Sequence, residues 1–158
     1  EQQDLRQYAS TLLVVALSQE GGAVAQIGDG VIVVKCGDEE WTWLLWPQRG
    51  EYTNTTFFLT DLHANQYLQV DSFPGCITDL ALMSDGLECL ALRYADQAVH
   101  QPFCNGMFQP LLVAQDSDEI KPLSNALMQY LASEPISSRT DDDVSIILAT
   151  RRLAATPT

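Results

Sequence analysis

Two acidic segments, far apart in the sequence, carry the side chains best suited to chemistry. Asp85 follows the apolar run at residues 80–83 and stands before a glycine, which is typical of a buried strand that ends in a turn. Three consecutive aspartates, at positions 141–143, precede a second apolar run at 144–149. Carboxylate oxygens are the ligands that hard divalent cations prefer. If the two acidic strand ends meet in the fold, the sequence predicts a cation site there.

Each acidic segment also has an ordinary structural interpretation. An Asp-Gly pair at a strand end is commonly only a turn, and the triplet at 141–143 fits a solvated acidic loop. Asp29, which stands between two glycines, fits a turn or a ligand. The cation hypothesis has one physical argument in its favour. Three adjacent carboxylates repel one another, Arg139 is the nearby residue of opposite charge, and a bound cation would cancel that repulsion.

The composition of the chain narrows the classes of partner. A length of 158 residues is enough for one domain with a real core. The formal net charge of −13 argues against nucleic acid and anionic membrane surfaces, because both attract basic proteins. The acidity fits cation binding or simply a soluble surface. No apolar run approaches the length of a membrane span and no signal peptide opens the chain, so we expect a cytoplasmic location.

The cysteines do not form a zinc-binding pattern. The four cysteines include no Cys-x-x-Cys pair, and the chain has only two histidines, which argues against a zinc finger. Cys36 and Cys89 lie in apolar runs, so we expect buried thiols rather than disulfides.

The order of the expected elements predicts the fold class. Short strands are expected at residues 11–17, 23–27, 31–36, 41–46, 55–60, 67–70 and 76–83, followed by helices at 100–114 and 117–133 and a last strand at 144–149. Pro110 is expected to kink or break the first helix. This order predicts an α+β fold, an antiparallel β-sandwich flanked by helices. We expect one domain at 8–151, with a linker at 1–7 and a frayed tail at 152–158.

Four short motifs occur in an order that resembles a known family. They are Ala-Ser-Thr at 9–11, Gly-Asp-Gly at 28–30, Ser-Asp-Gly-Leu at 84–87 and Asp-Asp-Val-Ser at 142–145. They resemble the C-terminal motifs of the metal-dependent PP2C-type protein phosphatases. The segment 50–56 also resembles a stretch found in a bacterial subgroup of that family.

The resemblance implies an activity and a set of ligands. Such enzymes use a two-metal centre with Mn²⁺ or Mg²⁺ to activate water against phosphoserine or phosphothreonine in proteins. By motif, Asp85 and Asp142 match two metal-binding aspartates, and Asp29 matches an additional, weaker position. Asp143 and Gly86 are further weak candidates.

The departures from the family pattern are equally informative. Gly30 stands for the usual Ser, Asp143 for the usual Asn and Ala9 for the usual Gly. The family's first half carries an acidic residue, an Asp-Gly that bridges both metals and often a phosphate-binding Arg, and nothing before Tyr8 matches them. We therefore expect the C-terminal portion of a phosphatase domain, inactive alone, whose partner is the N-terminal half. The alternative is a non-catalytic binding or regulatory module with the same sandwich.

Overall fold

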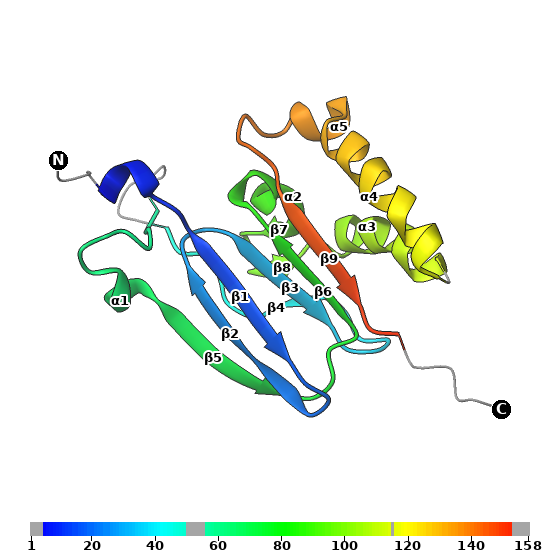
Figure 1. Ribbon diagram of the computed structural model, residues 1–158, viewed down its shortest axis with the longest axis horizontal. Helices are drawn as coiled ribbons and strands as arrows, with labels where there is room; N and C mark the ends of the chain where they lie inside the picture. The colour runs from blue at the N-terminus through cyan, green and yellow to red at the C-terminus, as the bar shows by residue number, and fades with distance from the viewer. Residues whose placement is uncertain (1–4, 50–55, 115, 153–158) are drawn as a thin grey trace.

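The computed structural model describes residues 5–49, 56–114 and 116–152 and contains two antiparallel sheets packed face to face (Figure 1). The first sheet has the strand order β1-β2-β5, and the second has the order β4-β3-β6-β9. The first consists of β1 (Leu12–Leu17), β2 (Gly21–Ile27) and β5 (Gln69–Pro74). The second consists of β4 (Thr42–Trp43), β3 (Val31–Lys35), β6 (Asp79–Met83) and β9 (Ile146–Thr150). The predicted α+β class is confirmed.

The central strands of the second sheet are apolar on both faces, and each face has its own core. Ile32, Val34 and Leu80 pack towards the first sheet, against Val24 and its neighbours. The alternate residues of the same strands, among them Val33, point to the other face and pack under the helices. This double burial explains why β3 and β6 read as continuous apolar runs rather than alternating ones.

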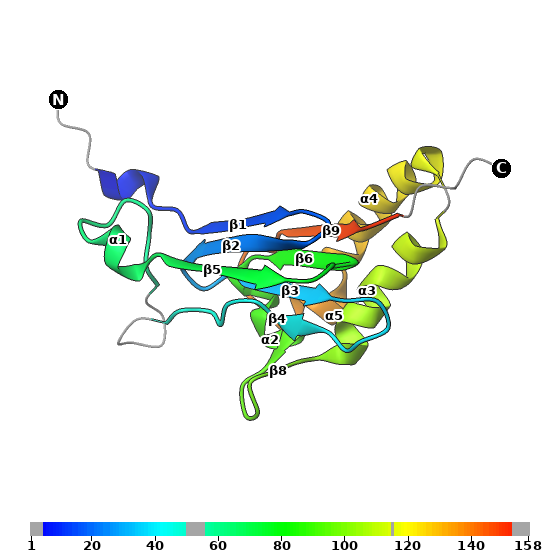
Figure 2. The same ribbon diagram turned by 90° about the horizontal axis from the view of Figure 1, so that it is seen from below.

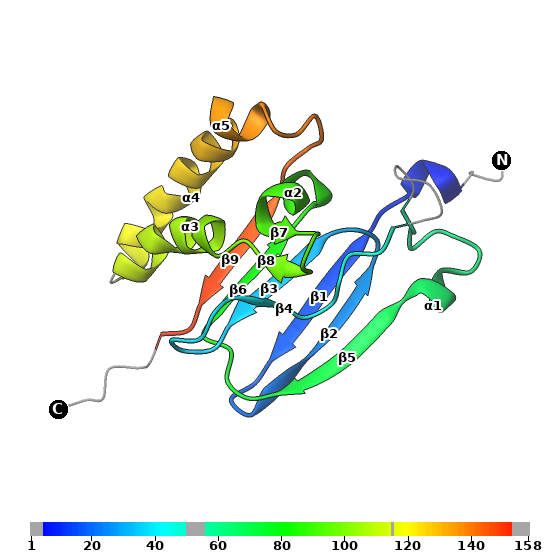
Figure 3. The same cartoon turned by 180° about the vertical axis from the view of Figure 1, so that it is seen from behind.

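Helices cover the face of the second sheet that points away from the first sheet (Figure 3). The major ones are α3 (Gln101–Val113) and α4 (Ser117–Leu131), the latter capped by Asp116, whose Oδ1 accepts from the amides of Asp118 and Glu119. Short elements complete the chain: η1 (Leu5–Tyr8), α1 (Ala64–Tyr67), η2 (Asp85–Leu87), α2 (Glu88–Ala91), β7 (Leu92–Arg93), β8 (Ala98–Val99) and α5 (Glu134–Ser137). No helix in these described ranges is long and apolar enough to cross a membrane.

Two expected strands differ from the structure because side chains, rather than a neighbouring strand, bind their backbones. The strand expected at 41–46 pairs only at β4, since the Gln101 side chain binds both the amide and the carbonyl of Trp41. The described part of the strand expected at 55–60 is not a strand. There Asp61 accepts from the Phe58 amide at 2.8 Å, and Phe57 stacks on Tyr67 at 3.7 Å.

Other expectations fail because tertiary packing outweighs local preference. Pro110 lies within α3 without ending it, since Cys104 and Phe108 are buried on the inner face of that helix. Burial raises the pKa of the Cys104 thiol to about 12. Cys89, expected to be buried, is exposed on short α2 and, like the other cysteines, is free. The loop expected at 134–140 contains α5.

Some expectations concern residues outside the described ranges. The linker expected at 1–7 lies partly there, although residues 5–8 form η1. The tail after residue 152, residue 55 and most of the segment 50–56 also lie outside the described ranges.

Candidate metal centre

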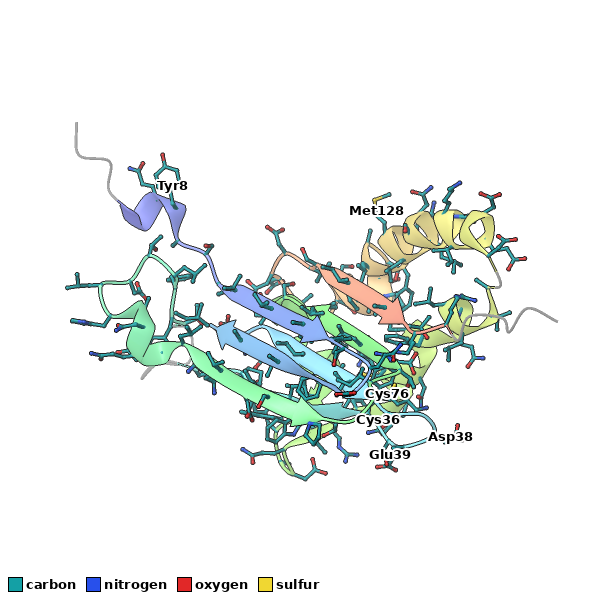
Figure 4. All side chains as sticks on the ribbon, turned by 60° about the horizontal axis from the view of Figure 1, so that its bottom comes forward. Tyr8, Cys36, Asp38, Glu39, Cys76 and Met128 are labelled. Atoms are coloured by element: carbon teal, nitrogen blue, oxygen red, sulfur yellow. The ribbon has the colours of Figure 1, made fainter. Side chains whose placement is uncertain are left out.

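Strand register brings the acidic segments to one end of the second sheet. Val31 pairs with Met83, and Met83 pairs with Ile146. Asp29 lies two residues before Val31, and Asp85 lies two residues after Met83. Asp142 lies four residues before Ile146. The opposite end of the sheet carries Cys36 with Asp38, Glu39 and Cys76, far from Tyr8 (Figure 4).

A buried glutamine shapes the loop that presents Asp29. The Gln26 side chain is fully buried, and its Nε2 donates to the carbonyls of Gly28 at 3.2 Å and Gly30 at 2.9 Å. Gly28 has a φ of 103°, which a residue with a Cβ rarely adopts. A Cβ on Gly30 would lie 2.7 Å from Leu13 Cδ1. Leu13 is only half-buried and its side chain can shift, so this contact favours glycine after Asp29 without requiring it.

Ser84 joins the Asp85 segment to the Asp142 segment. Its amide donates to the Ser145 carbonyl at 2.9 Å. Its hydroxyl donates to the Asp143 carbonyl at 3.1 Å and accepts from the Ser145 amide at 2.9 Å. Asp143 thus contributes its backbone to this junction. The sequence signal that could have pointed to this junction is the position of Ser84 directly after the strand end.

Gly86 contributes close packing and one hydrogen bond. Its amide donates to Asp85 Oδ1 at 2.9 Å. A Cβ at this position would lie 2.7 Å from the Asp143 carbonyl oxygen and 3.3 Å from that of Asp142. Glycine is therefore required for the two acidic segments to approach each other.

The carboxylates at this end influence one another electrostatically. Partial burial raises the pKa of Asp85, the charge of Asp29 raises it further, and the Gly86 amide opposes the shift. The charge of Asp142 raises the pKa as well. The sequence pattern predicted that Asp85 and Asp142 would share one end of the fold, and the structure places them there together with Asp29.

The donor chemistry of this end fits a hard divalent cation, because oxygen ligands and mutual carboxylate repulsion both favour one. In the described part of the chain, however, no three acidic, imidazole or thiol side chains converge closely enough to hold a metal ion. The three aspartates therefore form an open group of carboxylates rather than a complete cage.

Sequence reasoning missed two charged residues near the aspartates. Glu88 is buried at the start of α2, and Arg49 Nη2 donates to its Oε2 at 3.0 Å. Burial raises the pKa of Glu88, the Arg49 guanidinium lowers it, and the charges of Asp29 and Asp85 raise it. A single basic residue in a loop gives no sequence signal for such a contact, since the two residues are 39 positions apart.

Comparison with known proteins identifies the family. Residues 1–132 match the sequence profile described as Protein phosphatase 2C. The chain belongs to the protein phosphatase 2C family. It is 36% identical over 145 residues to Serine/threonine-protein phosphatase 3 of Escherichia coli (strain K12). That alignment covers 92% of this chain but only 56% of the E. coli protein.

Solved structures of bacterial phosphatases share the protein phosphatase 2C fold of this chain. A bacterial serine phosphatase crystal structure is similar with a TM-score of 0.54 and 20% identity, covering 92% of this chain and 59% of that one. Serine/threonine phosphatase Stp1 from Staphylococcus aureus gives a TM-score of 0.52 at 19% identity, covering 90% and 56%. The chain thus spans little more than half the length of the relatives it matches.

Proposed function

We propose that this chain supplies the second half of a metal-dependent phosphatase domain that hydrolyses phosphoserine and phosphothreonine in proteins. The observation that carries the proposal is that Asp29, Asp85 and Asp142 lie at one end of the second sheet, where the charges of Asp29 and Asp142 raise the pKa of Asp85. Membership of the protein phosphatase 2C family supports the reaction class.

Each residue of this end has a defined task in the proposal. Asp85 and Asp142 would hold Mn²⁺ or Mg²⁺, with Asp29 as a weaker additional ligand. When bound, such metals supply an activated water and neutralise developing charge on the phosphoryl oxygens. Gln26 fixes the loop of Asp29, and Ser84 fixes the distance between the other two segments.

The open side of the sandwich supports the idea that another half completes the domain. β1 and β9 are edge strands of the two sheets, and both lie towards the same side (Figure 2). Ile147 of β9 is 64% exposed although it faces the first sheet, since it pairs with Leu82, whose side chain packs on that side. β9 also borders an apolar groove of about 730 Å³ shared with α3 and α4. Unpaired apolar edges of this kind accept further strands, and the relatives contain additional chain.

The test compares the isolated chain with the completed domain, in which the proposed N-terminal half is fused or added separately. With Mn²⁺ and p-nitrophenyl phosphate or a phosphothreonine peptide, we expect no useful hydrolysis by the 158 residues alone. We expect chelator-sensitive hydrolysis by the completed domain and its loss with Asp85→Asn. Robust turnover by the isolated chain would show that it holds a complete site.

The second candidate is a non-catalytic binding or regulatory module. It is favoured by one observation, that the described carboxylates do not form a preformed metal cage. Absence of hydrolysis by the completed domain under the same conditions would select this candidate.

A further inference from the structure

Arg49 is tied to both segments that carry the central aspartates. The amide of its neighbour Gln48 donates to the Gly28 carbonyl at 3.2 Å, directly beside Asp29. The Nη2 of Arg49 donates at 3.0 Å to Oε2 of Glu88, which lies three residues after Asp85. Backbone and side chain together therefore hold this arginine at the acidic end of the second sheet.

An aromatic platform orients the guanidinium. Its central carbon lies 4.4 Å from the centre of the Tyr94 ring, a favourable cation–π contact. Trp46 packs edge-on against Tyr94 at 5.3 Å, and Trp43 packs against Trp46 at 5.4 Å. The Arg49 side chain is nevertheless 41% exposed. The guanidinium is planar, with Tyr94 on one face and Glu88 at one edge. Its remaining N–H donors therefore stay available to a ligand.

Glu88 anchors this arginine from a buried position. Its side chain is only 8% exposed, and among the described residues its buried Oε1 has no hydrogen-bond partner. Burying an unpaired carboxylate is costly, so the charge of Arg49 and that of Glu88 hold each other in place. Four other basic side chains bond elsewhere: Arg93, Lys121, Arg151 and Arg152.

We propose that Arg49 binds the phosphoryl oxygens of the substrate and that Glu88 is the residue that positions it. The inference rests on the proposed phosphatase function. A phosphate monoester is a dianion, which a sheet end lined by aspartates repels unless cations are present. A fixed guanidinium offsets that repulsion and makes paired, charge-assisted hydrogen bonds to two phosphate oxygens. The chain would then bring its own phosphate-binding arginine to the site.

The first experiment uses the completed domain with Mn²⁺ and p-nitrophenyl phosphate. We expect Arg49→Ala to raise both KM and the inhibition constant of inorganic phosphate about tenfold or more, the loss expected for a charged hydrogen bond. Arg49→Lys should recover part of the loss, because lysine restores the positive charge but cannot make the paired hydrogen bonds of a guanidinium. Arg152→Ala is the matched control, because this exposed arginine donates to the Leu111 carbonyl beyond the opposite end of β9, and it should leave both constants within about twofold.

The positioning role of Glu88 has its own signature. Glu88→Gln should raise KM less than Arg49→Ala does, and the double variant should resemble Arg49→Ala alone, because both changes act through one contact. Additive effects in the double variant would contradict the positioning role. Unchanged phosphate inhibition in a folded Arg49→Ala variant would overturn the proposal while leaving phosphatase activity intact.

The second experiment does not depend on turnover. In the isolated chain with Mg²⁺, the Nε–H signals of labelled arginines are followed by NMR during titration with inorganic phosphate. We expect a saturable shift for Arg49 and none for Arg152. If hydrolysis fails but this shift appears, the phosphate site stands and the proposed function falls. A shift at Arg152 instead, or at neither arginine, would count against Arg49.

Discussion

At the scale of single residues, the surroundings of Asp85 disfavour its charged form. Its pKa is raised in the folded chain by burial and by Asp29 and Asp142. A carboxyl group whose folded pKa exceeds its unfolded value destabilises the fold at neutral pH, and this cost disappears as the pH falls through the folded pKa. We therefore predict that Asp85→Asn raises the melting temperature of the metal-free isolated chain, since Asn still accepts from the Gly86 amide.

The carboxylates of Asp85 and Asp142 should raise the melting temperature once a cation is bound. Millimolar-order Mn²⁺ should stabilise the wild-type chain by relieving carboxylate repulsion, and a double Asp85→Asn, Asp142→Asn variant should lose that shift. The measurement is a thermal melt with Mn²⁺ and with chelator. A shift that persists in the double variant would assign the cation to another site.

At the scale of elements, the junction of η2 with the segment before β9 depends on the absence of one side chain. We predict that Gly86→Ala lowers the free energy of unfolding by about 1–3 kcal/mol through overpacking, because its Cβ would meet the Asp143 carbonyl oxygen at 2.7 Å. Gly106→Ala is the matched control within α3, where a Cβ meets nothing within 4 Å. Urea unfolding should show the control to be stabilised by about 0.5–1 kcal/mol. Equal effects of the two substitutions would contradict this account of the junction.

At the scale of the whole molecule, the open edges should govern assembly with the proposed N-terminal half of the domain. We predict that Ile147→Lys weakens complementation by a separately supplied N-terminal half at least tenfold, because a charge would replace an apolar side chain at the proposed interface. The isolated variant should keep its melting temperature, since Ile147 is largely exposed. Binding can be measured by calorimetry, with Val113→Lys on α3 as the control. Undiminished binding of the Ile147 variant would show that the N-terminal half docks elsewhere.

The sequence by itself determined the elements whose side chains form an apolar run or a helical spacing. Apolar runs predicted β1, β2, β3, β6 and β9 within a few residues of their observed bounds, and the helical spacing predicted α3 and α4. The motif order also predicted which carboxylates would share one end of the fold. These predictions succeed because strand and helix periods are local properties of side chains and of the backbone geometry that carries them.

Only the tertiary structure decided how the acidic end is built. The register of β3 with β6 and β9 places Asp29, Asp85 and Asp142 together, and the contacts of Gln26, Ser84 and the Arg49–Glu88 pair then set their surroundings. In each of these contacts, folding brings a polar group to its hydrogen-bond partner, which is either a backbone group or a side chain distant in sequence. Hydrogen bonds of this kind leave no periodic trace in the sequence, because their energy depends on burial and on geometry that exist only after the sheets have packed.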